Sequence, residues 1–407
     1  MRLTIDRLGH LGDAIAQAPE GAPEGPLYLK GFLPGEVIEG DDLAAMRIIT
    51  PSPQRVKPPC AHARTCGGCM MQHAADGFVA DWKQSVVQSA LRGQGIEADY
   101  LPMHISPPRS RRRASFAARR TKGGVLIGFH ARASDVLVDI PNCQLLHPDL
   151  LAALPKLPPL VQLGATRVAE ITVQVTQTLS GLDVAVQGGK ELDADAQMQL
   201  ARICESAGFA RLTWNGEVVA MRHAPMLRFG GALVAPPPAA FLQATADGEA
   251  ALLTAVLRAT GPARRVVDLF AGLGTFALPM AQTADVLAVE GDAAMMAALS
   301  IGARNAQGLR RVDVQTRDLF RRPLEVDEFK GVDAVIIDPP RAGAEAQMTT
   351  LAQSTVPRIA AVSCNPVSFA RDAKILIAGG YRLDFVQVVD QFRWSHHVEL
   401  AAGFSRK

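Results

Sequence analysis

The sequence predicts an α/β protein that ends in a doubly wound parallel sheet. The last third of the chain alternates apolar runs with helix-like stretches, and turn residues or helix-capping residues follow each run. This alternation is typical of parallel strands covered by helices. The expected strands lie near 266–270, 286–290, 312–316, 333–337 and 359–363. Two later runs, near 381–389 and 397–404, are expected to add an antiparallel edge.

Length and composition set the larger frame. The chain has 407 residues, of which 48% are hydrophobic, and a net charge of +2. This length indicates two or three domains with enough apolar side chains for separate cores. We find no uninterrupted apolar run long enough to cross a bilayer, and the N-terminus lacks the basic-then-apolar pattern of a signal peptide. We therefore expect a soluble, cytoplasmic protein without a membrane partner.

Residues 1–55 are predicted to form a small β-barrel. Short apolar runs at Arg2–Ile5, Leu27–Leu29 and Glu36–Ile38 are separated by glycine and proline turns.

Cysteines gather at the start of the next segment, 56–235. Cys60, Cys66 and Cys69 lie close together in sequence, and Cys143 follows later. A disulfide framework is unexpected in a long chain with six cysteines, so four thiolates suggest a metal centre. Four sulfurs suit either zinc or a [4Fe-4S] cluster, and the nearby His62 and His73 are possible zinc ligands. Two cysteines remain outside this group of four, and one of them, Cys204, is expected in a helix core.

Aromatic side chains in this segment are expected to be core rather than base-stacking platforms. Phe78, Trp82 and Val86 recur at helical spacing, which places them on one helix face. Phe116, in the predicted hairpin described next, is also assigned to the core, with stacking on a base as the alternative.

Basic residues accumulate on a predicted hairpin over residues 111–132, which turns at Lys122-Gly123-Gly124. The strip contains no acid and comprises Arg109, Arg111, Arg112, Arg113, Arg119, Arg120 and Lys122. Because the whole chain is nearly neutral, this local excess creates a directed field that suits a phosphate backbone. RNA contact is the favoured interpretation, and a solvated surface is the alternative.

Residues 236–407 begin with Pro236-Pro-Pro238 and contain a glycine-rich turn after their first strand. The turn, Asp268-Leu-Phe270-Ala-Gly-Leu-Gly-Thr275, gives a ligand close access to the backbone. Glu290 ends the second strand, at the distance where a carboxylate meets ribose hydroxyls in such sheets. The turn lacks a full Gly-x-Gly-x-x-Gly, which favours a smaller adenosine ligand such as S-adenosylmethionine over a dinucleotide.

Three further reactive groups follow later strands. Asp338 stands before a Pro-Pro turn, Cys364 follows the fifth strand, and Glu399 is embedded in the last one. Ligands gather at the carboxyl ends of parallel strands, so Cys364 is a candidate nucleophile, although many free cysteines are only small buried hydrophobes. Asp338 as a helix cap and Glu399 as an outward strand residue are the corresponding structural alternatives.

A thiol, a carboxylate and an adenosyl methyl donor form a consistent set for methylation at C5 of a pyrimidine. Addition of a thiolate at C6 makes C5 nucleophilic, which is covalent catalysis. A base must then remove the C5 proton, and Glu399 suits this role if burial raises its pKa.

These motifs resemble the RNA 5-methyluridine methyltransferases, in particular the iron–sulfur-containing bacterial enzymes that act on 23S ribosomal RNA. The resemblance spans nearly the whole chain and rests on Cys60-x5-Cys66-Gly-Gly-Cys69, Phe241-Leu-Gln243, the Asp268–Gly274 turn, Asp338-Pro-Pro-Arg341, Ser363-Cys364-Asn-Pro366 and His397-Val-Glu399. It implies a class I S-adenosylmethionine-dependent methyltransferase (Rossmann-like) domain, a central α+β domain bearing the cluster, and an N-terminal TRAM (OB-like) barrel. Compared with the barrel of the family, this one is shortened after Gly40.

The resemblance also implies roles for particular residues. Cys364 would be the nucleophile and Glu399 the proton acceptor. Contacts to S-adenosylmethionine would come from Gln243, Phe270, Thr275, Glu290, Asp318 and Asp338. The resemblance favours a [4Fe-4S] cluster over zinc, held by Cys60, Cys66, Cys69 and Cys143.

The implied reaction is methylation of 23S ribosomal RNA at uracil C5, of the uracil 1939 type rather than the uracil 747 type, by a monomeric enzyme. A transfer RNA uracil is one alternative substrate, and cytosine C5 is a weaker one. An alternative from another class is a metal-dependent RNA-binding protein without catalysis, which the presence of Cys364 and Glu399 disfavours.

Overall fold

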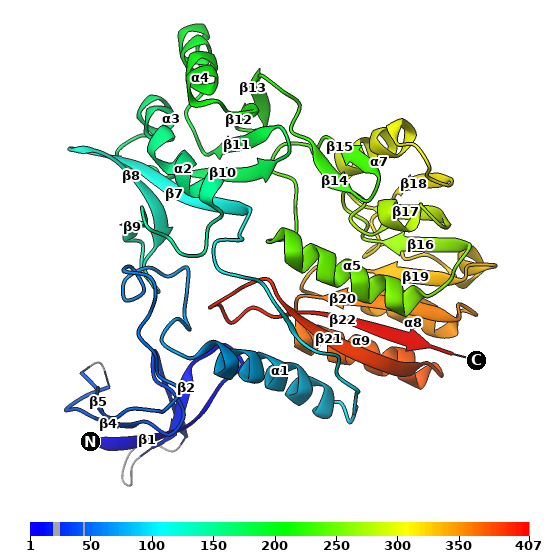
Figure 1. Cartoon of the computed structure of the whole chain (residues 1–407), viewed down its shortest axis with the longest axis horizontal. Coiled ribbons are helices and arrows are strands. Elements are labelled where there is room, and N and C mark those ends of the chain that lie inside the picture. The colour runs from blue at the N-terminus through cyan, green and yellow to red at the C-terminus, as the bar shows by residue number, and fades with distance from the viewer. Residues whose placement is uncertain (19–24, 44, 407) are drawn as a thin grey trace.

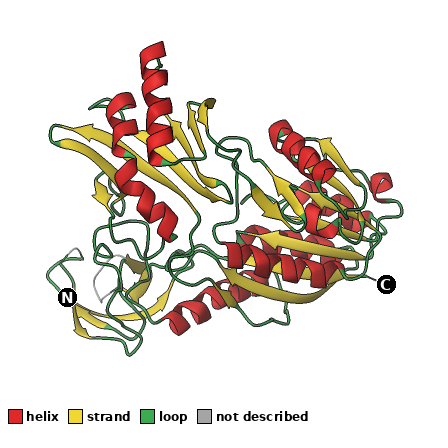
Figure 2. Cartoon of the chain, turned by 45° about the horizontal axis from the view of Figure 1, so that its top comes forward, coloured by secondary structure: helices red, strands yellow, loops and turns green. Residues whose placement is uncertain are grey.

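The structure is a computed structural model that describes residues 1–18, 25–43 and 45–406. Its strands form four sheets, which contain five, seven, two and eight strands (Figure 1). Helices lie against the seven- and eight-stranded sheets, and long loops join the parts (Figure 2). No helix among the described residues is long and apolar enough to cross a membrane.

The N-terminal sheet is antiparallel and has the strand order β3-β2-β1-β4-β5. Its side chains alternate between the core and the solvent, so Leu3 and Ile5 are buried while their neighbours are exposed. The strands expected in this region are therefore present. Their bounds are β1 (Arg2–Leu8), β2 (Ala14–Gln17), β3 (Pro26–Leu29), β4 (Val37–Glu39) and β5 (Arg47–Thr50).

Helix α1 (Asp76–Arg92) follows the cysteine-rich segment. It contributes side chains to two separate apolar clusters. Trp82 is buried in a small cluster with Leu33 and Met71, and Phe78 and Val86 pack against that cluster. The aromatic stripe is thus core, as the helical spacing predicted. Further along, α1 contributes Val87 to one core of the eight-stranded sheet.

The seven-stranded sheet has the order β13-β12-β11-β10-β7-β8-β9. Its first hairpin, β7 (Arg113–Thr121) and β8 (Gly124–His130), turns where the sequence predicted. Phe116 on β7 is fully buried, which excludes stacking on a base, and Cys204 is buried in helix α4 (Ala194–Ala207). The other elements are β9 (Leu137–Asp139), α2 (Pro148–Ala153), η1 (Leu154–Lys156), α3 (Pro158–Gly164), β10 (Ile171–Thr178), β11 (Gly181–Gln187), β12 (Arg211–Trp214) and β13 (Glu217–Met221). A small hairpin of β14 (Leu227–Phe229) and β15 (Ala232–Val234) follows.

The eight-stranded sheet has the order β18-β17-β16-β19-β20-β22-β21-β6. The first five strands in this order are parallel, β22 runs antiparallel to β20, and β21 runs antiparallel to β22. This is the doubly wound sheet with an antiparallel edge that the sequence predicted. The strands are β16 (Arg265–Leu269), β17 (Asp285–Glu290), β18 (Val312–Thr316), β19 (Ala334–Ile337), β20 (Arg358–Ser363), β21 (Arg382–Asp390) and β22 (Glu399–Ser405).

Strand β6 (His104–Ile105) was not predicted. It comes from the segment between α1 and the seven-stranded sheet, and it extends the eight-stranded sheet by pairing with the end of β21. Two residues carry too little periodicity to be read as a strand, so their pairing depends on tertiary structure.

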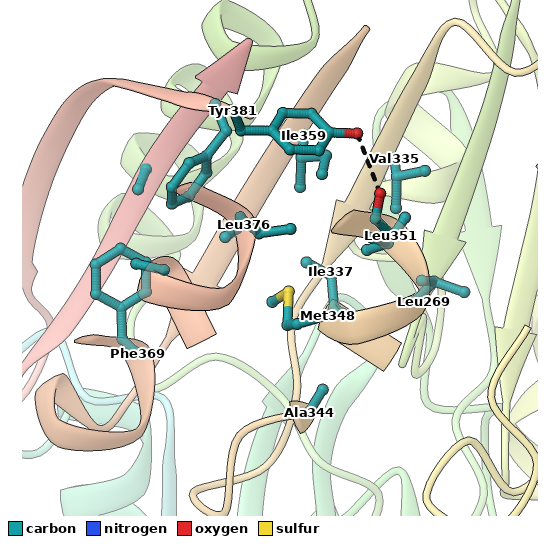
Figure 3. Packing of buried hydrophobic residues seen from close by; sticks show 14 of the residues in the cluster. Leu269, Val335, Ile337, Ala344, Met348, Leu351, Ile359, Phe369, Leu376 and Tyr381 are labelled. Carbon is teal, nitrogen blue, oxygen red and sulfur yellow. Dashed lines mark hydrogen bonds between the residues drawn. The ribbon is translucent and has the colours of Figure 1, made fainter. Parts of the chain in front are cut away.

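Helices cover both faces of this sheet and bury two apolar cores. In one core, shown in Figure 3, Leu269 and Ile337 from the strands meet Met348 and Leu351 from α8. Tyr381 closes it and donates a hydrogen bond from its hydroxyl to the Val356 carbonyl at 2.7 Å. The rigid sheet leaves its strand ends free to carry the site. The helices are α5 (Ala246–Thr260), α6 (Ala277–Met280), α7 (Ala293–Asn305), α8 (Glu345–Gln353) and α9 (Pro366–Ala378), with the short η2 (Val326–Phe329).

Candidate active site

The glycine-rich turn after β16 is shaped as the sequence predicted. Phe270 has a φ of +61°, and Gly272 and Gly274 also have positive φ, so the chain reverses sharply at the strand end. No heavy atom lies within 4 Å of the place where a side chain on Gly272 would begin. The backbone of the turn is therefore open to a ligand.

Glu290, at the end of β17, is tied to this turn. Its Oε2 accepts a hydrogen bond from the Gly272 amide at 3.1 Å, and its Oε1 accepts from the Gly291 amide at 2.6 Å. Both carboxylate oxygens of Glu290 are thereby held in place beside the open turn. The adjacent acid predicted from sequence spacing does lie next to the glycine turn.

Acids at neighbouring strand ends influence one another. The pKa of Asp338 is raised by burial, and the pKa of the fully buried Asp268 is raised by burial and by the charges of Asp338 and Glu290. A group of carboxylates that repel one another favours a positively charged ligand. S-adenosylmethionine, which carries a sulfonium and an ammonium, fits this site better than a phosphate-bearing dinucleotide.

Phe270 and Asp318 are brought near each other by the turn after β18. The Phe270 ring packs against the Phe320 ring with centroids 5.4 Å apart, and Asp318 Oδ1 accepts a hydrogen bond from the Phe320 amide at 3.0 Å. Phe320 is 52% exposed. An aromatic surface and a carboxylate thus border the turn, as an adenosyl group requires, and Thr275 lies partly buried at the end of the same turn.

Cys364 and Glu399 are neighbours across two paired strands. Cys364 follows β20 directly and Glu399 begins β22, and the register pairs Ser363 with Leu400. Burial, and to a lesser extent the charges of Glu399 and Asp338, raise the pKa of the Cys364 thiol to about 11. The candidate nucleophile, the candidate base and Asp338 therefore lie at one end of the sheet.

Glu399 is almost completely buried, with 4% of its surface exposed. Burial raises the pKa of its carboxyl, as does the charge of Asp338, whereas a hydrogen bond from Gln391 lowers it. A carboxylate held in this way is a stronger base than an exposed glutamate. The expectation that the site raises the pKa of Glu399 agrees with this environment.

Gln391 is a site residue that the sequence reasoning missed. Its Nε2 donates to Glu399 Oε2 at 3.1 Å and to Gln243 Oε1 at 2.6 Å, and its Oε1 accepts from the Ala244 amide at 2.8 Å. This buried amide joins the predicted cofactor residue Gln243 to the predicted base. The only signal in the sequence was its position in the short link between the last two strands.

Arg341 supplies a cation to the same place. Its charge lowers the pKa values of both Cys364 and Glu399, although burial outweighs it for each group. Its Nη2 lies 3.0 Å from His397 Nδ1, and its carbonyl accepts from the Asn365 side-chain amide at 2.9 Å. Asn365 also caps α9 through the Val367 amide, so the Asp338 turn and the Cys364 turn are fastened together.

Comparisons with known proteins agree with this geometry. Residues 236–407 match the tRNA (uracil-5-)-methyltransferase family. An uncharacterised RNA methyltransferase of Brucella suis biovar 1 is 43% identical, and the match covers 100% of this chain and 98% of that protein. A 23S rRNA (uracil(1939)-C(5))-methyltransferase of Chromohalobacter salexigens is 33% identical, over 98% of this chain and 87% of that protein.

The chain belongs to the RNA uracil-5-methyltransferase family.

Membership makes the protein an S-adenosylmethionine-dependent enzyme that methylates RNA at uracil C5. The fold agrees: the crystal structure of Pyrococcus abyssi tRNA (uracil-54, C5)-methyltransferase in complex with S-adenosyl-L-homocysteine has a TM-score of 0.76 to this chain, at 22% identity, over 99% of both chains. The family resemblance and the predicted methyltransferase fold are therefore confirmed.

The methyltransferase also gathers four of its cysteines around one small cavity, which Cys60, Cys66, Cys69 and Cys143 all line. Burial, together with the charges of the other three cysteines and against a lowering hydrogen bond with Gln72, raises the pKa of Cys69 to about 12. In the part of the chain that the structure describes, no three His, Cys, Asp or Glu side chains are arranged around a single ion. The four thiols are free and all border this one cavity.

The cysteine segment of the methyltransferase is attached to the loop that precedes Glu399. The amides of Met70 and Met71 both donate to the Trp394 carbonyl, at 2.7 and 3.0 Å. The two histidines considered as zinc ligands differ in position: His62 borders the cavity, and His73 is not among its lining residues.

Some arginines of the basic strip are bound to other residues of the protein. Arg112 does not face solvent as a free charge, because its Nη2 pairs with Glu249 Oε2 at 2.5 Å and its Nε donates to the Gln243 carbonyl at 3.1 Å. Sequence alone could not show this pairing, since the two residues are far apart in the chain. Arg109 instead donates to the Gln144 side chain.

Proposed function

We propose that this enzyme methylates C5 of a uracil in 23S ribosomal RNA, of the uracil 1939 type, through a covalent adduct on Cys364. The observation that carries the mechanism is the placement of Cys364 and Glu399 on paired strands at one sheet end. Support for the ribosomal substrate comes from the Chromohalobacter salexigens relative, whose name specifies uracil 1939.

In the first step, Cys364 loses its proton to solvent and the thiolate Sγ forms a bond to C6 of the uracil, while the electron pair of the C5–C6 double bond moves into the enolate. S-adenosylmethionine would supply the methyl group to the nucleophilic C5, and S-adenosylhomocysteine would be the leaving group. Glu399 then takes the C5 proton, the double bond re-forms, and the Cys364 sulfur leaves as thiolate. The side chain that starts the reaction is thereby regenerated.

Two environments prepare these groups. Burial and the charge of Asp338 raise the pKa of Glu399, and the hydrogen bond from Gln391 fixes Oε2 in place. Burial and the charges of Glu399 and Asp338 raise the pKa of the Cys364 thiol to about 11, which disfavours the thiolate. The positive charge of Arg341 is the protein's means of favouring the thiolate.

For the methyl donor, we propose the turn and strand ends described above as its cradle. The open backbone at Gly272 and the mutually repelling carboxylates are consistent with a cationic adenosyl ligand. The proposed contacts are Gln243, Phe270, Thr275, Glu290, Asp318 and Asp338.

For the cysteine centre, we propose a [4Fe-4S] cluster on Cys60, Cys66, Cys69 and Cys143. One zinc ion needs all its sulfurs at about 2.3 Å from one point, whereas a cluster can bind its four thiolates at separate irons. The family resemblance supports the second arrangement, and the four thiols that line one cavity are the residues that would hold it. The hydrogen bonds to the Trp394 carbonyl suggest a structural role, since they tie this centre to the loop before Glu399.

We propose the same three-part division as the sequence suggested: 1–55 as the shortened barrel, 56–235 as the central domain with the cluster and the basic hairpin, and 236–407 as the catalytic domain. In this proposal the enzyme acts in the cytoplasm as a monomer.

A transfer RNA uracil is the second candidate substrate, favoured by the description of the matching family. Tritium release distinguishes the two. Transcripts of a 23S rRNA fragment containing uracil 1939 and of transfer RNA, both made with 5-tritiated uridine, are incubated with the enzyme and S-adenosylmethionine. Release from the ribosomal fragment supports the proposal, and release from transfer RNA alone supports the second candidate. The absence of release from either RNA contradicts both.

A further inference from the structure

A cavity of about 360 Å³ lies between three segments that are far apart in the sequence. The cysteine segment contributes Gly67 and Met70, the start of β7 contributes Arg113 and Ser115, and the loop before β22 contributes His396 and His397. Its volume is within the range of sites that hold one small-molecule-sized group, about 300–1,000 Å³. It is separate from the glycine-rich turn, none of whose residues line it.

Three arginines line this cavity, and among the described residues Arg111 and Arg113 form no salt bridge, whereas Arg393 pairs with Asp76. The Arg113 guanidinium lies over the Phe241 ring, 4.9 Å from the centroid. The groups whose charges act on its pKa are Arg111 and Arg112, both cations, and burial lowers that pKa first. Among the described residues Arg113 has no salt bridge, and a largely enclosed cation in that situation attracts an anion.

The neighbouring arginines show the contrast. Arg112 is neutralised by Glu249, whereas Arg111 adds a second unpaired cation and donates from Nε to the Arg113 carbonyl at 3.1 Å. The Arg112 amide also donates to the Ala244 carbonyl at 3.0 Å. These contacts hold the start of β7 rigidly against the segment that carries Gln243, so the position of Arg113 relative to the catalytic residues is fixed.

The cavity is close to the reacting groups. His397 lines it and lies 3.0 Å from the Arg341 guanidinium, whose charge acts on Cys364 and Glu399. A polynucleotide that places one base at Cys364 therefore brings the next nucleotide within reach of this cavity.

We propose that this cavity holds one nucleotide of the RNA chain beside the target uridine, with its phosphate on Arg113. This inference rests on the proposed function for the identity of the polymer. It assigns to Arg113 the role of positioning the chain, separate from the chemistry at Cys364.

The test uses two substitutions at Ser115, an exposed cavity-lining residue whose replacement leaves the core intact. Ser115→Glu places an anion beside Arg113, and Ser115→Gln adds similar volume without charge. Binding of the fluorescein-labelled 23S rRNA fragment and of transfer RNA is measured by fluorescence anisotropy over a series of salt concentrations. We expect Ser115→Glu to weaken binding of one of these RNAs about tenfold, whereas Ser115→Gln leaves it within about twofold.

The second variant, Arg113→Gln, removes one phosphate contact. We expect its log Kd to depend less steeply on log salt, by about 0.7–1 in slope, because one fewer counterion is released. Arg202→Gln, at an exposed site on α4, is the matched control and leaves the slope unchanged. Equal binding by both Ser115 variants, together with an unchanged slope for Arg113→Gln, overturns the proposal. Tritium release by the wild type in that case leaves the proposed function intact.

Discussion

Gln391 and Glu399 are joined by a buried hydrogen bond, from Gln391 Nε2 to Glu399 Oε2 at 3.1 Å. The same amide holds Gln243 at 2.6 Å, so one side chain fixes a residue proposed for the cofactor and the residue proposed as base. Because Gln391 is 1% exposed, its hydrogen bonds have no competition from bulk water. The geometry of proton removal depends on a residue that does not itself react.

Gln391→Leu should therefore lower kcat more than it raises KM for RNA. Loss of a hydrogen bond to a charged group costs about 1.5–3 kcal/mol, which corresponds to roughly 10- to 100-fold in rate. The bond from Gln391 lowers the pKa of Glu399, so its removal raises that pKa, and the acidic limb of the pH–kcat profile should move to higher pH. Gln387→Leu, a partly exposed position on β21, is the control. An unshifted profile in Gln391→Leu would contradict the positioning role.

Glu399→Gln should stop the reaction after methyl transfer. Addition of Cys364 and transfer of the methyl group precede proton removal, so the methylated RNA should remain attached to the protein. Denaturing gels and intact mass of the conjugate measure this species. Glu345→Gln, on the exposed start of α8, should turn over normally. Rapid turnover by Glu399→Gln would exclude Glu399 as the base.

Arg341→Gln should make Cys364 less reactive. The positive charge of Arg341 lowers the pKa of a thiol that burial has raised to about 11, so its removal raises that pKa further and reduces the thiolate fraction at a fixed pH. Alkylation of Cys364 by iodoacetamide at pH 8, followed by peptide mass spectrometry, should slow by up to about tenfold for each pKa unit. Arg310→Gln, an exposed arginine elsewhere, should alkylate at the wild-type rate. Equal rates in both variants would remove Arg341 from the account.

Much of the catalytic sheet could be predicted because its strands are buried on both faces and appear as continuous apolar runs. The groups that follow those runs, such as Glu290 and Cys364, were placed correctly at the strand ends for the same topological reason. Gln391 and the Arg112–Glu249 pair could not be predicted. Each depends on contacts between segments more than 130 residues apart, which local periodicity does not encode.

The N-terminal strands were foreseen from turns and short apolar runs, whereas β6 was not, because two residues have no measurable period. The cysteine spacing indicated a metal centre but not its kind. That distinction depends on how far apart the sulfurs are held in three dimensions.

Cys69→Ser should lose the metal centre, and Cys204→Ser should retain it. Cys204 is buried on α4 outside the four-cysteine cavity, which makes it a matched control for loss of a thiol. Anaerobically purified wild type should contain about four iron atoms and four labile sulfides per chain. About one zinc per chain instead would assign the site to zinc, and equal metal content in the two variants would refute the ligand role of Cys69.

The most direct test of the account is the bond between sulfur and the nucleobase. The 23S rRNA fragment and transfer RNA, each synthesised with 5-fluorouridine at the target position, are incubated with enzyme and S-adenosylmethionine. With fluorine in place of hydrogen at C5, the base has no proton to remove after methyl transfer. The adduct should therefore persist. Peptide mass spectrometry should find the nucleotide on Cys364, and Cys364→Ala should yield none. An adduct mapped to another residue, or no adduct with either RNA, would contradict the central claim.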